Sequence, residues 1–234
     1  AARLPVPLHW SYRLLRRFPG SAATTMVPTQ SMKRELASYG FTNLALWSRG
    51  VDAHRFSPGA RHGFAWLPRP HLLYVGRVAV EKNIEAFLSM DMPGSKIVVG
   101  DGPQLSQLKA SYPAAHFSGH LAGDALTSAY RSADVLVFPS RTDTFGNVML
   151  EALACGTPVA AYPVTGPIDV LTDAKAAAMH DHLETAVRRA LGLSREAARC
   201  HALHFSHRQA ALQFAENLVP ARAIAPSVEI GKAA

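Results

Sequence analysis

Two cations stand where their side chains could bind an anion. Arg77 and Lys82 follow a short apolar run, and Gly76 between run and cations lets the backbone turn sharply. An arginine offers a planar fork of donors and a lysine a mobile point charge, so together they can neutralise a diphosphate without a metal ion. The alternative is a solvated helix start in which Glu81 or Glu85 pairs with Lys82.

Two carboxylates stand inside the apolar, small-residue segment 138–159. Asp143 and Glu151 are separated by eight positions, and a helix is expected to begin at Phe145 or Gly146. Eight helical positions span about 12 Å, which is too far for a closely coupled acid and base. The spacing suits two distant contacts on one elongated, hydroxyl-rich ligand. In the alternative reading, Asp143 or Thr144 caps the helix and Glu151 lies on its exposed face.

Two further loops follow predicted strands. Gly100 and Gly102 in segment 98–104 allow close backbone approach, which a purely structural turn also requires. The turn at His120 and Leu121 could lie against a nucleobase. Neither loop predicts a ligand by itself.

The histidines do not predict a metal site. His180 and His182 flank an aspartate in a loop, while His201, His204 and His207 advance by three along an expected helix and drift around its axis. Such spacing does not converge on an ion. We therefore expect neither a metal nor a bound cofactor.

Composition sets the compartment and the class of partner. The chain has 234 residues, 48% of them hydrophobic, and a net charge of +7. The charge suits nucleic acid, an acidic membrane surface or a phosphorylated small molecule. Cys155 and Cys200 make no disulfide framework, which indicates a reducing cytoplasm. No window approaches the ~20 apolar residues that span a bilayer, so any membrane contact is expected to be peripheral.

The elements that position these residues alternate between strand and helix, which predicts a Rossmann-like α/β fold: a parallel sheet with helices on both faces. The carboxyl ends of its strands then share one edge, where ligands bind. Predicted strands are 24–27, 44–47, 71–75, 96–99, 116–117, 135–138 and 159–162; predicted helices begin near 29 and cover 82–90, 104–111, 123–132, 147–154, 183–191 and 195–218.

Five motifs, taken together and in order, resemble the GT-B glycosyltransferases of family 4. The resemblance covers about residues 24 to 218 and is strongest to bacterial members that transfer glucose or mannose to lipids or polysaccharides. The motifs are RGVD and HRF within 49–56, YVGRVAVEKNI at 74–84, VVGDGP at 98–103, ADVLVFPSRTDTFGNVMLEALACGTPVAAYPVTGP at 133–167 and FSHRQAALQF at 205–214.

The resemblance implies a retaining, metal-independent hexosyltransferase that uses a UDP- or GDP-hexose and a lipid or saccharide acceptor. It would work in the cytoplasm, with peripheral contact to an anionic membrane. The implied catalytic residues are Arg77, Lys82 and Asp143. Implied donor contacts are Gly76, Arg77 and Lys82 at the diphosphate, Glu151 at the ribose, Asp143 at the sugar, the backbone of Phe145, Gly146 and Asn147 at sugar and phosphate oxygens, and His120 and Leu121 beside the base.

The resemblance also divides the chain and exposes departures from the family. Asp143 replaces the usual Glu, His207 replaces a common Trp, and most of the N-terminal domain is missing, so we expect impaired transfer by this chain alone. The predicted divisions are a remnant of the acceptor-side domain at 1–56, a linker at 57–70, a nucleotide-sugar domain at 71–204, a crossing helix at 205–219 and a flexible tail at 220–234.

Two other function classes are weighed against the enzyme. A non-catalytic module could bind a nucleotide sugar, or a partner, without transferring anything. A basic nucleic-acid-binding protein would suit the charge and the aromatic residues among the arginines of 1–23, but the sequence holds no RRM, KH or helix-turn-helix pattern. We therefore expect no nucleic-acid partner.

Overall fold

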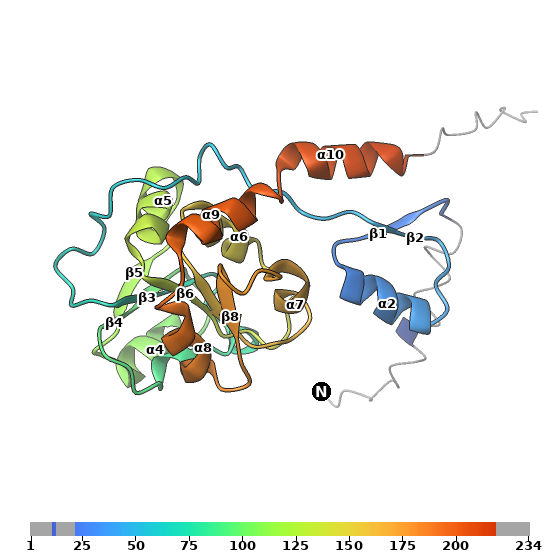
Figure 1. The fold of residues 1–234 in the computed structure, drawn as a ribbon. Coiled ribbons are helices and arrows are strands. Elements are labelled where there is room, and N and C mark those ends of the chain that lie inside the picture. Colours follow the sequence, from blue (N-terminus) through green and yellow to red (C-terminus); the bar gives the residue numbers. More distant parts are fainter. Residues whose placement is uncertain (1–10, 13–21, 219–234) are drawn as a thin grey trace, which may run out of the picture.

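The computed structural model describes residues 11–12 and 22–218, and its larger part is a six-stranded parallel sheet (Figure 1). The strand order is β5-β4-β3-β6-β7-β8, so the predicted parallel α/β architecture is confirmed. The strands are β3 (His71–Val75), β4 (Ser95–Val99), β5 (His116–Gly119), β6 (Val135–Phe138), β7 (Val159–Ala161) and β8 (Ala177–Met179).

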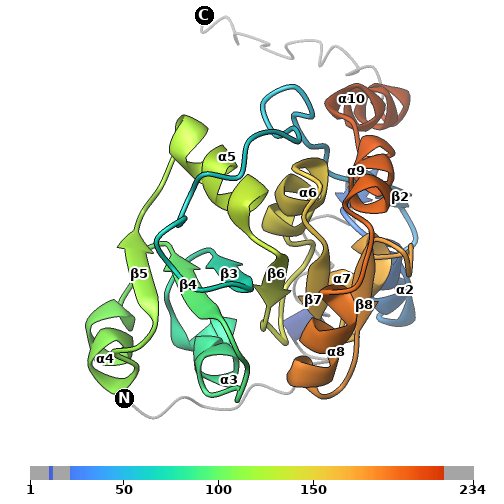
Figure 2. The ribbon, with the colours of Figure 1, turned by 60° about the vertical axis from the view of Figure 1, so that its left-hand side comes forward.

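Helices cover both faces of this sheet (Figure 2). Successive side chains of a strand point to opposite faces, and in β3 Leu73 joins one apolar cluster while Leu72 and Tyr74 join the other. The helices α5 (Gly123–Ser132), α6 (Asn147–Ala154) and α9 (Arg195–Leu203) pack on the first face; α3 (Ile84–Leu88), α4 (Leu105–Ser111) and α8 (Leu183–Ala190) pack on the second.

The direction of chain progression reverses between β3 and β6. From β3 the chain moves outward to β4 and β5, and from β6 it moves outward the other way to β7 and β8. The loops that leave these two neighbouring strands therefore diverge. Divergence of this kind opens a crevice at the carboxyl edge of a doubly wound sheet.

A smaller unit precedes the large sheet. It consists of β1 (Thr25–Val27), α2 (Gln30–Ser38) and β2 (Leu44–Leu46), with β1 and β2 paired in parallel as predicted. Thr29 caps α2 because its side chain accepts from the N–H of Met32 at 3.2 Å. The C-terminal helix α10 (His207–Glu216) returns to lie against this unit (Figure 1), and Trp47 Nε1 donates to Ala210 O at 3.1 Å.

Two predicted helices are wrong in extent. The single helix at 195–218 is interrupted because Ser206 is extended, with φ −84° and ψ 150°, and caps α10 from outside. The predicted helix 82–90 starts as a 3-10 turn, η2 (Val80–Lys82), and Asn83 then adopts a left-handed conformation, φ 53°, before α3 begins. Sequence reasoning also missed β8 and the short helix α7 (Pro167–Val170).

Several predictions concern residues outside the described part. Most of the basic segment 1–23 and the whole tail 220–234 lie there. Among the described residues, no helix has the length and apolar character needed to cross a bilayer.

Candidate functional site

A cavity of about 450 Å³ opens at the crevice between β3 and β6. Seven predicted site residues line it: Gly76, Arg77, Lys82, Asp143, Phe145, Gly146 and Asn147. The loop after β3 and the loop before α6 supply them, which is the arrangement that the strand order requires.

The loop after β3 is held by contacts with the side chain of Tyr74 and with the loop after β4. The buried hydroxyl of Tyr74 donates to Arg77 O at 2.7 Å, and burial raises the pKa of this phenol. A Cβ on Gly100 would lie 1.9 Å from Gly76 O, so the loops after β3 and β4 touch backbone to backbone. Gly100 therefore serves this contact, as the structural reading of its turn proposed. The guanidinium of Arg77 is largely exposed, 3.6 Å from Glu81.

Lys82 and Asp143 form an ion pair inside the cavity. Lys82 Nζ lies 2.7 Å from Asp143 Oδ2, with side chains 26% and 16% exposed. The alternative pairing of Lys82 with Glu81 or Glu85 is thus wrong. Because the other oxygen, Oδ1, accepts from Phe145 N at 3.3 Å, both oxygens of this carboxylate are engaged.

The amino end of α6 faces the cavity without a side-chain cap. Gly146 precedes the helix in a left-handed conformation, φ 81°, and no side chain bonds to the first turn. The reading in which Asp143 or Thr144 caps α6 is therefore wrong. An uncapped helix start leaves backbone N–H groups and the positive end of the helix dipole available to an anion.

Glu151 lies on α6 but does not line this cavity. It is half-buried, and the hydroxyl of the fully buried Tyr130 donates to its Oε2 at 2.6 Å. Burial raises the pKa of Glu151, against the smaller opposing effects of the Tyr130 hydrogen bond and Arg55. The reading of Glu151 as an exposed surface residue is wrong. His120, which is exposed, and Leu121, which packs against the core, also lie outside the cavity lining.

Arg49 and Ser140 are two of the polar lining residues that sequence reasoning missed. Arg49 lines the cavity from the segment after β2. Ser140 lines it two residues after β6; the side chain is 1% exposed and its Oγ has no hydrogen-bond partner among the described residues. A buried hydroxyl without a partner is costly, and a ligand oxygen would satisfy it. Its place directly after a strand at the reversal point was the signal available in the sequence.

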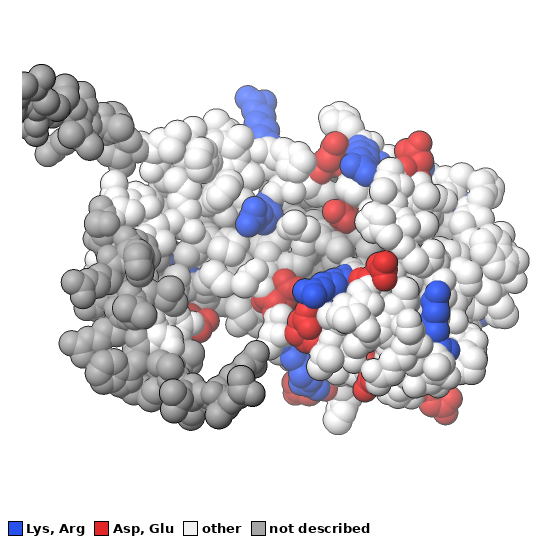
Figure 3. Space-filling view, turned by 180° about the vertical axis from the view of Figure 1, so that it is seen from behind, with Lys and Arg blue, Asp and Glu red and all other residues white. Residues whose placement is uncertain are grey.

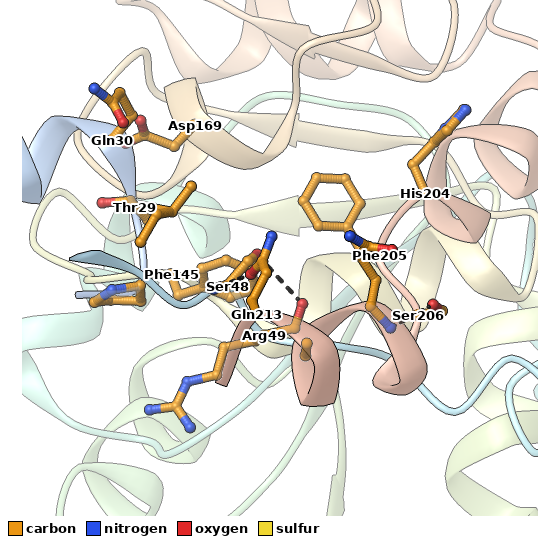
Figure 4. A pocket seen from close by; sticks show the side chains of 14 residues that line it. Thr29, Gln30, Ser48, Arg49, Phe145, Asp169, His204, Phe205, Ser206 and Gln213 are labelled. Carbon is orange, nitrogen blue, oxygen red and sulfur yellow. Dashed lines mark hydrogen bonds between the residues drawn. The ribbon is translucent and has the colours of Figure 1, made fainter. Parts of the chain in front are cut away.

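Two more cavities adjoin the first along the seam between the small unit and the large sheet. One of about 890 Å³ shares Lys82, Asp143 and Thr144 with it and takes its far wall from α2. The other, of about 240 Å³, shares Arg49 and Phe145 and lies beside α10 (Figure 4). The backbone N–H of Ser31 donates across the seam to Asp169 Oδ1 at 3.0 Å.

The charges of the first cavity favour a polyanion. Its charged lining residues are Arg49, Arg77, Lys82 and Asp143, which sum to +2 at neutral pH. On the face in Figure 3 the described acidic and basic side chains are otherwise interspersed. Nowhere in residues 11–12 and 22–218 do three His, Cys, Asp or Glu side chains converge to hold a metal; His201 Nε2 lies 2.7 Å from Val170 O instead.

Solved structures with the same architecture confirm the predicted GT-B type of fold. A sucrose-phosphate synthase from Thermosynechococcus elongatus superposes with a TM-score of 0.78 at 23% identity, over 92% of this chain and 62% of the other. An Anabaena protein crystallised with UDP and glucose gives a TM-score of 0.73 at 16% identity, over 90% and 67%. These similarities concern the fold.

The sequence places the chain more narrowly. Residues 69–192 match the family described as Glycosyl transferases group 1, and the chain belongs to this family. A GDP-mannose-dependent alpha-mannosyltransferase of Mycobacterium tuberculosis is 34% identical over 72% of this chain and 47% of its own length. A sulfoquinovosyl transferase of Arabidopsis thaliana is 37% identical over 70% and 35%. The chain thus spans less than half the length of these relatives.

Proposed function

We propose that this chain binds the donor of a retaining hexosyltransferase, which moves glucose or mannose from a UDP- or GDP-hexose to a lipid or saccharide acceptor. The observation that carries the proposal is the cavity at the reversal point, where Arg77, Lys82 and the uncapped start of α6 converge. The similarity to GDP-mannose-dependent enzymes and to a fold crystallised with UDP and glucose supports the choice of donor class.

The proposed chemistry rests on stabilising the leaving group. A nucleoside diphosphate gains negative charge as the glycosidic bond breaks, and fixed cations with a helix amino end stabilise that charge best away from water. Arg77 and Lys82 would act on it directly. In this proposal two cations fulfil the role that a metal ion has in other sites, so no metal is needed.

Asp143 is proposed to orient the sugar. Its oxygens already accept from Lys82 Nζ and Phe145 N, so the carboxylate is held in place and is poorly suited to attack a carbon. Retention is then proposed to result from attack by the acceptor on the face from which the leaving group departs. Glu151 is proposed to bond the ribose, and His120 and Leu121 to flank the base once the donor is bound.

The adjoining cavity of about 890 Å³ is proposed to receive the acceptor, because it meets the donor cavity at Lys82 and Asp143. Its lining mixes the apolar side chains of Met32 and Ile168 with the charged Glu35 and Arg141. A lipid or saccharide acceptor would suit such a surface. Peripheral contact with an anionic membrane, in the cytoplasm, belongs to the same proposal.

A second candidate is a module that binds a nucleotide sugar without transferring it. The observation in its favour is that the relatives are more than twice as long as their matched part, while the donor-cavity residues all lie in this chain. Calorimetric titration with UDP-glucose and GDP-mannose, followed by a transfer assay on the 234-residue chain, separates the two. Binding with turnover supports the enzyme, and binding alone supports the module.

The test of the donor site is Lys82→Ala. Losing a charge-assisted hydrogen bond to phosphate should weaken nucleoside diphosphate binding by about 1.5–3 kcal/mol. Lys109→Ala, on the exposed face of α4, is the matched control and should bind as the wild type does. Equal affinities of the two variants would remove Lys82 from the donor site.

A further inference from the structure

Arg49 differs from the other cations of the donor cavity in its origin and its surroundings. It comes from the segment after β2, whereas Arg77 and Lys82 come from the loop after β3. Its guanidinium lies 5.5 Å from the ring centre of Trp47, and in Figure 4 it points away from Asp169 and His204.

The backbone on both sides of Arg49 is fixed to the α9–α10 segment. Before it, Ser48 N donates to Gln213 Oε1 at 2.9 Å. After it, Val51 N donates to Phe205 O at 2.8 Å, and a Cβ on Gly50 would lie 2.6 Å from the His207 backbone. Because this backbone is anchored, binding a ligand through the exposed Arg49 side chain costs less conformational entropy than it would on a free loop.

The charge balance of the cavity leaves Arg49 uncompensated. Lys82 is paired with Asp143 at 2.7 Å, and Arg77 has Glu81 at 3.6 Å. Among the described residues, Arg49 is the cation of this cavity that has no acidic partner within ion-pair distance. A diphosphate, which is multiply charged at neutral pH, would gain most from that cation.

We propose that Arg49 is a third cation for the donor diphosphate, contributed by the side of the cavity that belongs to the small β1-α2-β2 unit. This inference rests on the proposed donor site. Its consequence is that a bound diphosphate contacts both parts of the chain, since Arg77 and Lys82 belong to the large sheet. Donor affinity then depends on how α10 holds the segment around Arg49.

The test compares Arg49→Gln with Arg208→Gln by calorimetric titration of the 234-residue chain with UDP, GDP and the matching monophosphates. Arg208 is an exposed arginine of α10 outside the cavity lining, so the control makes the same change in net charge. Loss of a charge-assisted contact should weaken diphosphate binding about tenfold or more and monophosphate binding less than about twofold. Arg49→Lys should recover part of the loss, because a point charge remains.

Each outcome decides a separate question. Equal diphosphate affinities of the two Gln variants would overturn the role of Arg49 while leaving the donor site intact. Equal losses for monophosphate and diphosphate would also overturn it, since Arg49 would then act on the nucleoside or the fold. A wild-type chain that binds neither UDP nor GDP would instead refute the proposed function. Thermal unfolding of each variant checks that the fold is retained.

Discussion

At the scale of single residues, the proposed donor cavity is organised around the ion pair of Lys82 and Asp143. Lys82 Nζ is paired with the Asp143 carboxylate and, in the proposed function, would also bind a phosphate of the donor. Removing one partner of a partly buried ion pair costs more stability than the intact pair contributes, because the remaining charge is left without compensation. The two residues should therefore respond differently to substitution.

Replacing Asp143 with Asn should separate binding from transfer. The change removes the charge that competes for Lys82, so affinity for free UDP or GDP should stay the same or rise by a few fold. Transfer from the nucleotide sugar should fall by about tenfold or more, since the sugar loses an ionised hydrogen-bond acceptor. Titration and a transfer assay measure the two effects, with Asp173→Asn, outside all the cavities described, as control. Parallel losses in both would contradict the proposal.

Tyr130 should set the pH dependence of donor binding through Glu151. Burial raises the pKa of Glu151, and the hydrogen bond from Tyr130 partly offsets the rise. The proposed contact of Glu151 with both ribose hydroxyls requires the ionised carboxylate, so the affinity for the nucleotide should fall as the pH drops through this pKa. Tyr130→Phe keeps the ring and removes the donor, so the fall should begin at a higher pH.

The measurement is the affinity for UDP or GDP between pH 7 and pH 4, repeated with the 2′-deoxy analogue. The analogue lacks one of the two hydroxyls and should show a smaller difference between wild type and variant. Identical pH profiles for wild type and Tyr130→Phe would show that this hydroxyl does not tune Glu151.

At the scale of elements, the order of strands decides where the site lies, and much of it was predictable. The glycines and the apolar alternation predicted the parallel sheet and the two loops that carry Arg77 and Asp143, and most strands begin and end within two residues of expectation. The break between α9 and α10 at Ser206 was harder to predict from the sequence. A serine within an amphipathic pattern also suits a helix interior, and its extended conformation depends on the distant pairing of Val51 with Ser206.

The site residues that lie close together in the sequence could be predicted from their side-chain types. Those that meet only through the packing of distant elements could not. Arg49 lies 28 positions before Arg77 in the sequence, so only the fold brings the two to one cavity. The contact of Tyr130 with Glu151 joins α5 to α6 and leaves no local pattern. For the same reason β8, a run of Ala, Ala and Met, carries no strand propensity and forms because β7 is beside it.

Docking of α10 should depend on Gly50. An added Cβ would meet the His207 backbone at 2.6 Å, and backbone cannot move aside as a side chain can. Gly50→Ala should destabilise this contact by about 1–3 kcal/mol. Hydrogen exchange of residues 207–216 should accelerate. Gly192→Ala is the matched control, because its nearest atom, Arg189 O, lies at 3.7 Å; similar exchange in both variants would refute the contact.

At the scale of the whole molecule, arginines join segments that are distant in sequence. Arg199 donates to Ala53 O and Phe56 O at 2.9 and 2.8 Å, and to Ala154 O at 2.8 Å, which ties the segment after β2 to the end of α6. Arg61 and Arg69 bind Asp134 from within the predicted linker 57–70. The two parts of the chain are thus connected by an anchored segment, and the seam between them carries the cavities.

Asp134 should make this connection sensitive to acid. Burial alone would raise its pKa, but hydrogen bonds from the N–H of His71 and from Arg61, with the charge of Arg69, lower it overall. A lowered folded-state pKa gives stability that is present above the unfolded value, about 4, and is lost as the pH falls through the folded value. Asp134→Asn should therefore unfold at a lower temperature at pH 7, and the gap to wild type should close toward pH 3.

Thermal unfolding across that range tests the prediction, with the exposed Asp181→Asn as control. The control should follow the wild-type curve at each pH. A constant gap between Asp134→Asn and wild type from pH 7 to pH 3 would mean that the loss is one of packing and not of charge.

The return of α10 to the small unit also has a consequence for biosynthesis. Trp47 and its partner Ala210 are separated by 163 positions, so the small unit leaves the ribosome well before its covering helix exists. At about 5–20 residues per second, that interval lasts between roughly 8 and 33 seconds. During it the ring of Trp47 lacks its contact with Phe214, 5.0 Å away in the finished protein. The nascent chain therefore exposes this aromatic surface to chaperones until α10 has been synthesised.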